Sequence, residues 1–582
     1  MTFKVPVNAK TFLLKYAVDI DDLYSLPQFA DVNEELVSDI LSGGATFAEE
    51  VLAPINREGD LNPAQLTETG VVASPGFKEA YRSFVEAGWL SLSIPEAMGG
   101  AGMPSLVSVA VNEMIYASNM SFGLCPMLTS SAAKAIAAHA SDELKAAYLP
   151  KMTTGEWSGA MDLTEPQAGS DLGPIRTKAV PNSDGTYAIS GQKIFITWGD
   201  HDCAENIIHL VLARLPDAPA GSKGISLFLC PKFLVNKDGS LGKRNNFQAI
   251  SLEHKIGIHA SPTCVMEFSG ATGWLVGEAN RGLSCMFTMM NEARLFVGVQ
   301  GVAIGERAYQ AALSFSKERV QGRVINGEPG DPIIGHPDVR RMLLDMKTRL
   351  MGARAICMAT AKASDIAGAT QDEDTRKSAH KREALLTPIA KSYGSDIGVD
   401  TASIGVQVHG GMGFIEETGA AQHYRDSRIA PIYEGTNGIQ AIDLVGRKLR
   451  RDGGEGMTAL LYDLNKIHSD AELAGKSTQE ALMSGIATLE EATKLVLGMD
   501  ELDTLSIASN YLELAGHVIS GGLLIRAACK GSQANDPLAE NMMAMARYHS
   551  SAVLPKAAAL LSSIKAGAGP VFAYPADNLV DL

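Results

Sequence analysis

The carboxylate of Glu434 lies in a segment whose neighbours suit the abstraction of a proton from carbon. In Pro431-Ile-Tyr-Glu-Gly-Thr-Asn-Gly438, an apolar residue and an aromatic ring precede the carboxylate and a glycine follows it. Tyr433 would shield the carboxylate from water and raise its pKa, as a base for a carbon acid requires. Gly435 would let the backbone approach a ligand closely. The structural alternative, which this segment alone favours, is a helix start capped by Thr436 or Asn437.

A second segment offers hydroxyl groups on a loop shaped by proline and glycine. In Leu163-Thr-Glu-Pro-Gln-Ala-Gly-Ser-Asp171, Thr164 and Ser170 could meet a carbonyl group or the edge of a cofactor ring, as could the backbone N–H groups. Residue types alone favour a turn between domains at this position.

A glycine-rich turn follows Gln407 and His409 and could admit a pyrophosphate. It lacks the complete G-x-G-x-x-G pattern behind a strand, so the end of a helix is the alternative. His409 and His423 are typical of core or surface histidines, and no H-E-x-x-H motif occurs. We therefore expect no metal centre.

Four successive regions would position these segments. Helical periodicity indicates an N-terminal extension and helical domain over residues 1–160, interrupted by a loop at Ile94 to Pro104. Short β-rich runs predict a small sheet or barrel over 161–281. A helical bundle over 282–452 and an additional helical domain over 453–582 complete the chain, with a glycine-rich boundary near Asp452. The predicted class is mainly α with a central β domain.

Composition excludes several kinds of partner. The 582 residues carry 50 basic and 66 acidic side chains, and this net charge of −16 would repel nucleic acid and anionic lipid. The seven cysteines are scattered singly, which is typical of reduced thiols in a cytoplasmic protein. The sequence shows no export signal and no uninterrupted run of 18 apolar residues, so we expect no membrane insertion.

Taken together, the motifs resemble the acyl-CoA dehydrogenase family over roughly Phe47 to Arg447. The matching segments occur in the order that the family has them: Pro95-Glu-Ala-Met-Gly-Gly100, Leu163 to Asp171, Gly191-Gln-Lys-Ile-Phe-Ile-Thr197, Gln407-Val-His-Gly-Gly-Met-Gly-Phe414, Tyr424-Arg-Asp426 and Ile432-Tyr-Glu-Gly-Thr436. The resemblance implies an N-terminal helical domain, a middle β-barrel and a C-terminal helical bundle, with an extra C-terminal helical domain in this chain.

The resemblance also implies roles for individual residues. Glu434 matches the base that takes the α-proton of an acyl thioester. The residues implied for binding FAD within the subunit are Met161, Leu163, Thr164, Ser170, Phe195, Thr197 and Thr436. Those implied for holding the FAD of a neighbouring subunit, in a homodimer or larger homo-oligomer, are Arg319, Gln407 and Gly411. Those implied for the substrate are Ser170, Arg294, Tyr433 and Gly435.

Some relatives carry the base immediately before the arginine of the first bundle helix. Here that position is Ala293, before Arg294, so it cannot serve as a base. Glu292 is one residue out of register, which turns a helical side chain by about a quarter-turn. Trp198, where a smaller residue is common, could change the pocket beside the flavin.

The terminal extensions resemble a long bacterial subgroup of the family. That likeness implies 3-(methylthio)propanoyl-CoA as substrate, in dimethylsulfoniopropionate degradation, with medium- or long-chain fatty acyl-CoA as the alternative. It also implies an electron-transfer flavoprotein as acceptor, whereas an acyl-CoA oxidase would use oxygen. A DNA-binding member of the family would need a basic terminal domain, but the region from Arg451 is acidic. A non-catalytic scaffold would not need a carboxylate at position 434.

Overall fold

The chain is mainly helical, and its computed structural model describes residues 3–580. It divides into two compact units that are each discontinuous in sequence. The unit we call the helical unit comprises Met1–Ser42, Pro104–Glu113 and Arg294–Leu582. The unit we call the mixed unit comprises Gly43–Met103 and Met114–Ala293. Three helices, α3 (Glu34–Phe47), α6 (Ser105–Ser118) and α9 (Gly282–Glu318), contribute residues to both units.

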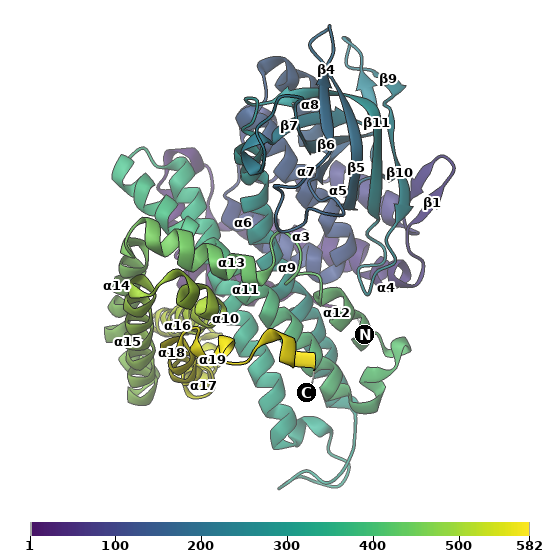
Figure 1. Cartoon of the computed structure of the whole chain (residues 1–582). Coiled ribbons are helices and arrows are strands. Elements are labelled where there is room, and N and C mark those ends of the chain that lie inside the picture. The colour runs from purple at the N-terminus through teal and green to yellow at the C-terminus, as the bar shows by residue number, and fades with distance from the viewer. Residues whose placement is uncertain (1–2, 581–582) are drawn as a thin grey trace. The chain divides into compact units, whose positions relative to one another are not determined.

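The mixed unit combines helices with the strands of the molecule (Figure 1). Its helical elements include the end of α3 (Glu34–Phe47), a π-helical turn (Ala48–Leu52), α4 (Ala53–Leu61), α5 (Phe77–Glu86), α7 (Met120–His139) and α8 (Asp142–Thr154). Its strands are β1 (Gln65–Thr67), β2 (Gly70–Val72), β3 (Trp157–Asp162), β4 (Lys178–Pro181), β5 (Tyr187–Thr197), β6 (Asn206–Ala213), β7 (Ser226–Pro231), β8 (Phe233–Val235), β9 (Leu241–Arg244), β10 (Phe247–Leu252) and β11 (Thr263–Val276).

A seven-stranded sheet forms the centre of the mixed unit. The strand order is β3-β6-β7-β11-β5-β4, and β10 also pairs with β11. The long β11 joins the two parts of the sheet, because its first residues pair with β5 and β10 and its last three pair with β7. Every residue of β6 is buried, as expected for an apolar strand covered on both faces. The expected middle β region is therefore present.

Two features of the mixed unit differ from the helical prediction for residues 1–160. Residues 65–72 form the hairpin of β1 and β2, whose threonine and valine residues suit strands. Strand β3 starts at Trp157 rather than after Ala160, because this buried segment pairs in parallel with β6. Tertiary pairing overrides a weak local signal in both places.

The helical unit is built mostly from long helices. Its longer helices are α1 (Val7–Tyr16), α10 (Pro337–Ala369), α11 (Glu373–His409), α14 (Glu455–Asp470), α15 (Lys476–Gly498), α16 (Glu501–Gln533), α17 (Ala539–Ala552) and α18 (Lys556–Ala566). Shorter ones are α2 (Asp21–Tyr24), α12 (Ala420–Ser427), α13 (Asn437–Asp443) and α19 (Gly569–Phe572). The bundle and the additional C-terminal helices expected from periodicity are both present.

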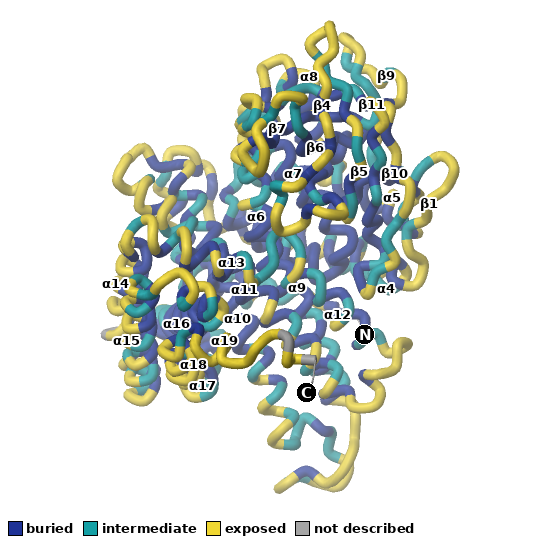
Figure 2. The backbone as a smooth tube through the Cα atoms, in the orientation of Figure 1, coloured by how far each residue is buried: buried dark blue, intermediate teal, exposed yellow. Residues whose placement is uncertain are grey.

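Helix α16 is the buried centre of the C-terminal helices, as its dark trace in Figure 2 shows. It packs against α10, α11, α14, α15, α17 and α18. By length and composition alone α16 could cross a bilayer, but 83% of its most apolar window is buried inside the fold. Such burial is typical of a core helix.

Glycines let α9 and α11 approach closely within the helical unit. A Cβ atom on Gly301 would lie 2.3 Å from the backbone oxygen of Gly394, and one on Gly398 would lie 2.3 Å from the oxygen of Gly301. Gly298 likewise faces Ala390, where a Cβ would lie 2.3 Å from the backbone oxygen. Gly301 is thus a packing residue of α9.

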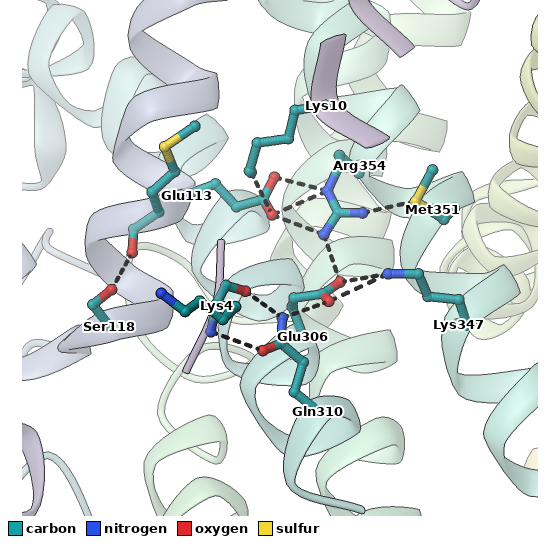
Figure 3. A network of polar contacts seen from close by, with 10 residues as sticks. Lys4, Lys10, Glu113, Ser118, Glu306, Gln310, Lys347, Met351 and Arg354 are labelled. Atoms are coloured by element: carbon teal, nitrogen blue, oxygen red, sulfur yellow. Dashed lines mark hydrogen bonds and ion pairs between the residues drawn. The ribbon is translucent and has the colours of Figure 1, made fainter. Parts of the chain in front are cut away.

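A buried ionic network ties the N-terminal α1 to the bundle (Figure 3). Lys10 Nζ lies 2.7 Å from Glu113, whose carboxylate also accepts hydrogen bonds from the Arg354 guanidinium at 2.8–3.0 Å. Arg354 also donates to Glu306, which pairs with Lys347. Burial alone would raise the pKa of Glu113, but Arg354 and Lys10 hold it below its ordinary value.

Candidate active site

Glu434 lies in a strained turn between α12 and α13 of the helical unit. Its φ is +56°, and that of Gly435 is +84°. A non-glycine residue in this left-handed region costs on the order of 1–3 kcal/mol and persists only where its surroundings hold it. The Glu434 carbonyl accepts hydrogen bonds from Arg294 Nε at 3.4 Å and from Gln440 Nε2 at 3.5 Å. The turn therefore fixes the direction in which the Glu434 side chain leaves the backbone.

Gly435 and Thr436 complete the turn. The φ of Gly435 favours glycine, and a Cβ there would lie 2.7 Å from Gln440 Nε2, so the end of that side chain would have to shift. Thr436 Oγ1 accepts a hydrogen bond from Ile439 N at 3.2 Å and caps α13. The helix start capped by Thr436, which the sequence offered as the structural alternative, is therefore present. It places the Glu434 carboxylate just before the N-terminus of α13.

The pKa of the Glu434 carboxyl group is raised to about 7, because its half-buried side chain loses part of its hydration. The positive charges of Arg294 and Lys391 act in the opposite direction and favour the carboxylate. Arg294 is buried on α9, and burial lowers its own pKa against the attraction of Asp443 and Glu434. A carboxyl group with a pKa near 7 can accept a proton and release it at physiological pH.

Lys391, which the sequence analysis did not single out, supports the turn from α11. It is fully buried, and its Nζ donates to the carbonyl of Ala430 at 2.9 Å and to Asn437 Oδ1 at 2.7 Å. Burial lowers its pKa to about 7, and Asp396 and Glu434 oppose this shift. The two hydrogen bonds hold both ends of the segment that carries Glu434. The sequence signal that could have identified Lys391 is its position as the single charged residue in Leu386-Thr-Pro-Ile-Ala-Lys-Ser-Tyr393.

Tyr433 is anchored to α9. Its hydroxyl donates to Oε1 of Gln300, which is fully buried. The ring is half-buried beside Glu434 in the chain, as the sequence predicted for an aromatic neighbour. Direct contact of Tyr433 and Gly435 with a substrate remains a prediction.

The mixed unit gathers most of the residues implied for FAD on adjoining segments. Met161 lies on β3, and Leu163 and Thr164 follow it. The Ile194 N–H donates to the Thr164 carbonyl at 2.9 Å, which joins this segment to β5, the strand of Phe195 and Thr197.

Two features of these segments fit an aromatic cofactor. Phe195 is 58% exposed and has a φ of +60°, so a large apolar ring is held out of the core in a strained conformation. Thr164 and Thr197 are half-exposed residues with hydroxyl groups on the two joined segments. Ser170 is exposed on the loop that follows Thr164. An apolar ring beside hydroxyl groups suits the ring system of FAD.

A buried ion pair secures the same segment. Lys193 Nζ donates to the Leu163 carbonyl at 3.0 Å and to Glu165 Oε1 at 2.8 Å. Burial would raise the pKa of Glu165, but Lys193 and hydrogen bonds from Thr177 and Arg176 lower it to about 2. The side chain of Leu163 itself is buried, so its contribution to a bound cofactor would come from its backbone.

Trp198 and Glu292, which the sequence analysis considered near the active site, contact other residues of the mixed unit. Trp198 is buried, its indole N–H donates to the Ser121 carbonyl at 3.0 Å, and it stacks on Phe77. The expectation that Trp198 changes a pocket surface is not met, because its ring packs in the core of the mixed unit. Glu292 pairs with Lys134 at 2.6 Å, which agrees with its exclusion as a base.

The residues implied for a neighbouring subunit lie at one end of the bundle. Arg319 follows α9, Gln407 lies in the last turn of α11, and Gly411 follows it. Phe315 and His409 bring these helix ends together, with ring centroids 4.5 Å apart. All three implied residues are exposed.

Family models match most of the described chain. They are the acyl-CoA dehydrogenase N-terminal domain (residues 39–156), middle domain (160–271) and C-terminal domain (280–449), and an acetyl-CoA dehydrogenase C-terminal-like domain (460–575).

Three known proteins show the extent of the similarity. The 3-methylmercaptopropionyl-CoA dehydrogenase of Ruegeria pomeroyi is 47% identical over 530 residues, which cover 90% of each chain. A broad-specificity linear acyl-CoA dehydrogenase of Mycobacterium tuberculosis is 35% identical, with 84% of this chain and 82% of that protein covered. The fold is similar to that of an acyl-CoA dehydrogenase from Bacillus anthracis complexed with FAD, with a TM-score of 0.75, 21% identity, and coverage of 97% and 92%. The chain therefore belongs to the acyl-CoA dehydrogenase family.

Proposed function

We propose that this FAD-dependent acyl-CoA dehydrogenase uses Glu434 as the base that removes the α-proton of its acyl-CoA substrate. The observation that carries the proposal is the half-buried Glu434 carboxylate, fixed in a strained turn, with a pKa raised to about 7. The C–H bond at Cα breaks, its proton passes to Glu434, and its electron pair enters the new Cα–Cβ double bond. FAD, when bound, supplies the acceptor for the hydride that leaves Cβ.

Groups around Glu434 would assist this proton transfer. The backbone N–H of Glu434 would polarise the thioester carbonyl and so acidify Cα. Arg294 and Lys391 moderate the rise in the pKa of Glu434, so that part of the population is deprotonated at neutral pH. Hydroxyl groups and the exposed ring of Phe195 would hold FAD in the mixed unit, and Thr436 would bind its pyrophosphate.

We propose 3-(methylthio)propanoyl-CoA as the preferred substrate, giving methylthioacryloyl-CoA. Methylmercapto and methylthio name the same group, and the Ruegeria relative that carries this substrate in its name spans nine-tenths of the chain at 47% identity. The alternative is a medium- or long-chain fatty acyl-CoA. The mycobacterial relative, which is named a broad-specificity linear acyl-CoA dehydrogenase, supports a linear acyl chain at lower identity.

The experiment is anaerobic mixing of the purified holoenzyme with a panel of acyl-CoAs while flavin absorbance is recorded. The proposal expects rapid flavin bleaching with the methylthio compound, at a higher kcat/KM than with butanoyl- or octanoyl-CoA. Preference for a fatty acyl-CoA would overturn the substrate assignment and leave the reaction class intact. Lack of bleaching with every thioester would overturn the function.

We infer that the active enzyme is at least a homodimer. Arg319, Gln407 and Gly411 are exposed together, and large apolar side chains beside them are also exposed: Met412, Phe414 and Ile415. Phe414 is 86% exposed, and such a patch is typical of an interaction surface. Light scattering of the holoenzyme should give a dimer or larger mass, and Phe414→Glu should lower that mass.

An electron-transfer flavoprotein is the proposed acceptor of electrons from the reduced enzyme, and the cytoplasm is the proposed location. The seven cysteines form no disulfide, which suits a reducing compartment. Turnover with the flavoprotein but negligible oxygen consumption would separate this proposal from an oxidase.

A further inference from the structure

A cavity of about 480 Å³ lies in the helical unit, apart from the turn that carries Glu434. It is bounded by the chain around Val18 and by α10, α11, α14 and α16. Its volume falls within the ~300–1,000 Å³ range of small-molecule sites. The helices α14 and α16 belong to the C-terminal domain, and the Val18 segment belongs to the N-terminal extension. The cavity therefore depends on parts of the chain outside the resemblance region of 47–447.

Aliphatic side chains form most of the wall. The larger ones are Ile366, Leu386, Leu460, Leu464, Ile519 and Leu523. Alanines at positions such as Ala359 and Ala363 leave the space open between them. None of the lining residues within the described part of the chain carries an aromatic ring. Such a wall suits a flexible alkyl chain and offers no stacking partner to a planar ring.

Cations gather at the edge of this wall. The lining residues with positive charge are Lys362, Arg382, Lys466, Arg526 and Lys530. Each of them has a carboxylate partner among the described residues. Asp463 lies 2.7 Å from Arg382 and 3.3 Å from Lys466, and Asp22 pairs with Lys362. Asp19 pairs with both Arg526 and Lys530.

Among the described residues that line the cavity, five carry a positive charge and two, Asp22 and Asp463, carry a negative charge, in a chain whose net charge is −16. A local positive excess of this kind, beside low-dielectric walls, attracts an anionic group. A ligand that complements an apolar wall with a cationic edge has an aliphatic chain and a head group with one negative charge.

We propose that this cavity binds a long-chain fatty carboxylate, with the alkyl chain among α10, α14 and α16 and the carboxylate at the cationic edge. Lys466 is the most accessible of the five edge cations, with a side-chain exposure of 60%. It can turn toward a bound carboxylate while Asp463 keeps its contact with Arg382. This site is separate from the proposed reaction and does not depend on Glu434.

The test is titration of the holoenzyme with a fluorescent C18 polyene carboxylate, displaced by palmitate. Hexadecan-1-ol and palmitoyl-CoA serve as competitors that lack the carboxylate or carry a different head group. The proposal expects palmitate to displace the probe better than hexadecan-1-ol. Equal or stronger displacement by palmitoyl-CoA would show that the site takes the thioester, and would overturn the carboxylate assignment.

Variants locate the site. Ala359→Phe fills the cavity from α10 and should abolish the displaceable binding. Lys466→Glu reverses one exposed charge and should weaken the affinity for palmitate by about fivefold. Lys476→Glu is the matched control, because Lys476 is 87% exposed on α15 and does not line the cavity. Binding that survives Lys466→Glu unchanged, or that Glu434→Gln removes, would overturn the proposal. Lys466→Glu keeps the test valid if Ala359→Phe fails to fold.

Discussion

Glu434 combines an unfavourable backbone conformation with an unfavourable environment for its charge. Its left-handed φ is maintained by hydrogen bonds from Arg294 and Gln440 to its carbonyl, and burial raises its pKa to about 7. Strain of this kind persists where the surroundings over-determine a position, and it is common at functional sites. Under the proposed function, this cost in stability would hold the carboxylate in place for proton abstraction.

The raised pKa of Glu434 predicts the pH dependence of the reaction. A base must be deprotonated to accept a proton, so kcat/KM should rise with pH and reach half its plateau near pH 7. An ordinary glutamate would give a midpoint near the reference pKa of 4.5. The measurement is kcat/KM for an acyl-CoA between pH 5 and pH 9. A profile that is flat down to about pH 5 would contradict the assignment.

Lys391 should act as a positioning residue. Lys391→Met removes the hydrogen bonds to Ala430 and Asn437 and a charge that favours the Glu434 carboxylate. The midpoint of the pH profile should therefore move upward, by roughly 0.5–1 unit, and the plateau rate should fall. Lys377→Met on the same helix is the control, because Lys377 is 64% exposed. A lower plateau rate with an unchanged midpoint of the pH profile would show that Lys391 has a structural role only.

The sequence could predict Glu434 as the base, but it could not predict the residues that hold the turn around it. The aromatic and glycine neighbours that predicted a shielded carboxylate are local, so they are visible in the chain. Lys391 is 43 positions away, and only folding places its Nζ at the Ala430 carbonyl. Likewise, the packing of Trp198 on Phe77 depends on contacts across the mixed unit that no local pattern shows.

Among the elements, α9 and α11 depend on glycine for their contact. Gly301→Ala would put a methyl group about 2.3 Å from the Gly394 carbonyl oxygen, so the helices must separate. We expect a loss of about 1–3 kcal/mol of stability. Gly368→Ala in the last turn of α10 is the control, because a Cβ there meets nothing within 4 Å. It should be neutral or stabilising, by about 0.4–1 kcal/mol. Thermal unfolding of both variants tests this, and equal midpoints would refute the packing account.

Elements with strong periodicity were predictable, and short ones were not. The β-rich region expected over 161–281 contains strands such as β5, and the helical bundle expected from residue 282 begins with α9. The hairpin of β1 and β2 has strands of three residues, too short for an alternating pattern to be recognised. The pairing that extends β3 back to Trp157 is long-range and parallel, so no local signal specifies it.

For the molecule as a whole, the network of Figure 3 ties the N-terminal extension to the bundle through buried charge. Glu113→Gln would leave Lys10 and Arg354 buried without their shared carboxylate, and should cost about 3–5 kcal/mol. Lys10→Met should cost much less, because Glu113 keeps Arg354. Thermal unfolding midpoints measure the difference. Equal losses would contradict the central role of Glu113.

The same network predicts sensitivity to acid. The pKa values of Glu113 and Glu306 in the folded state are held below the reference value of 4.5. Groups with lowered folded pKa values stabilise the protein above that reference value, and this contribution is lost as the pH falls through the folded values. The advantage of the wild type over Glu113→Gln should therefore shrink as the pH falls below about 4.5.

The most direct test of the central claim is anaerobic flavin bleaching by the Glu434→Gln holoenzyme. The amide keeps the size of the side chain but cannot take a proton, so FAD and acyl-CoA should still bind while the bleaching rate falls by about 100-fold or more. Glu417→Gln, at an exposed position, should bleach like the wild type. Bleaching of Glu434→Gln at the wild-type rate would mean that another group removes the α-proton.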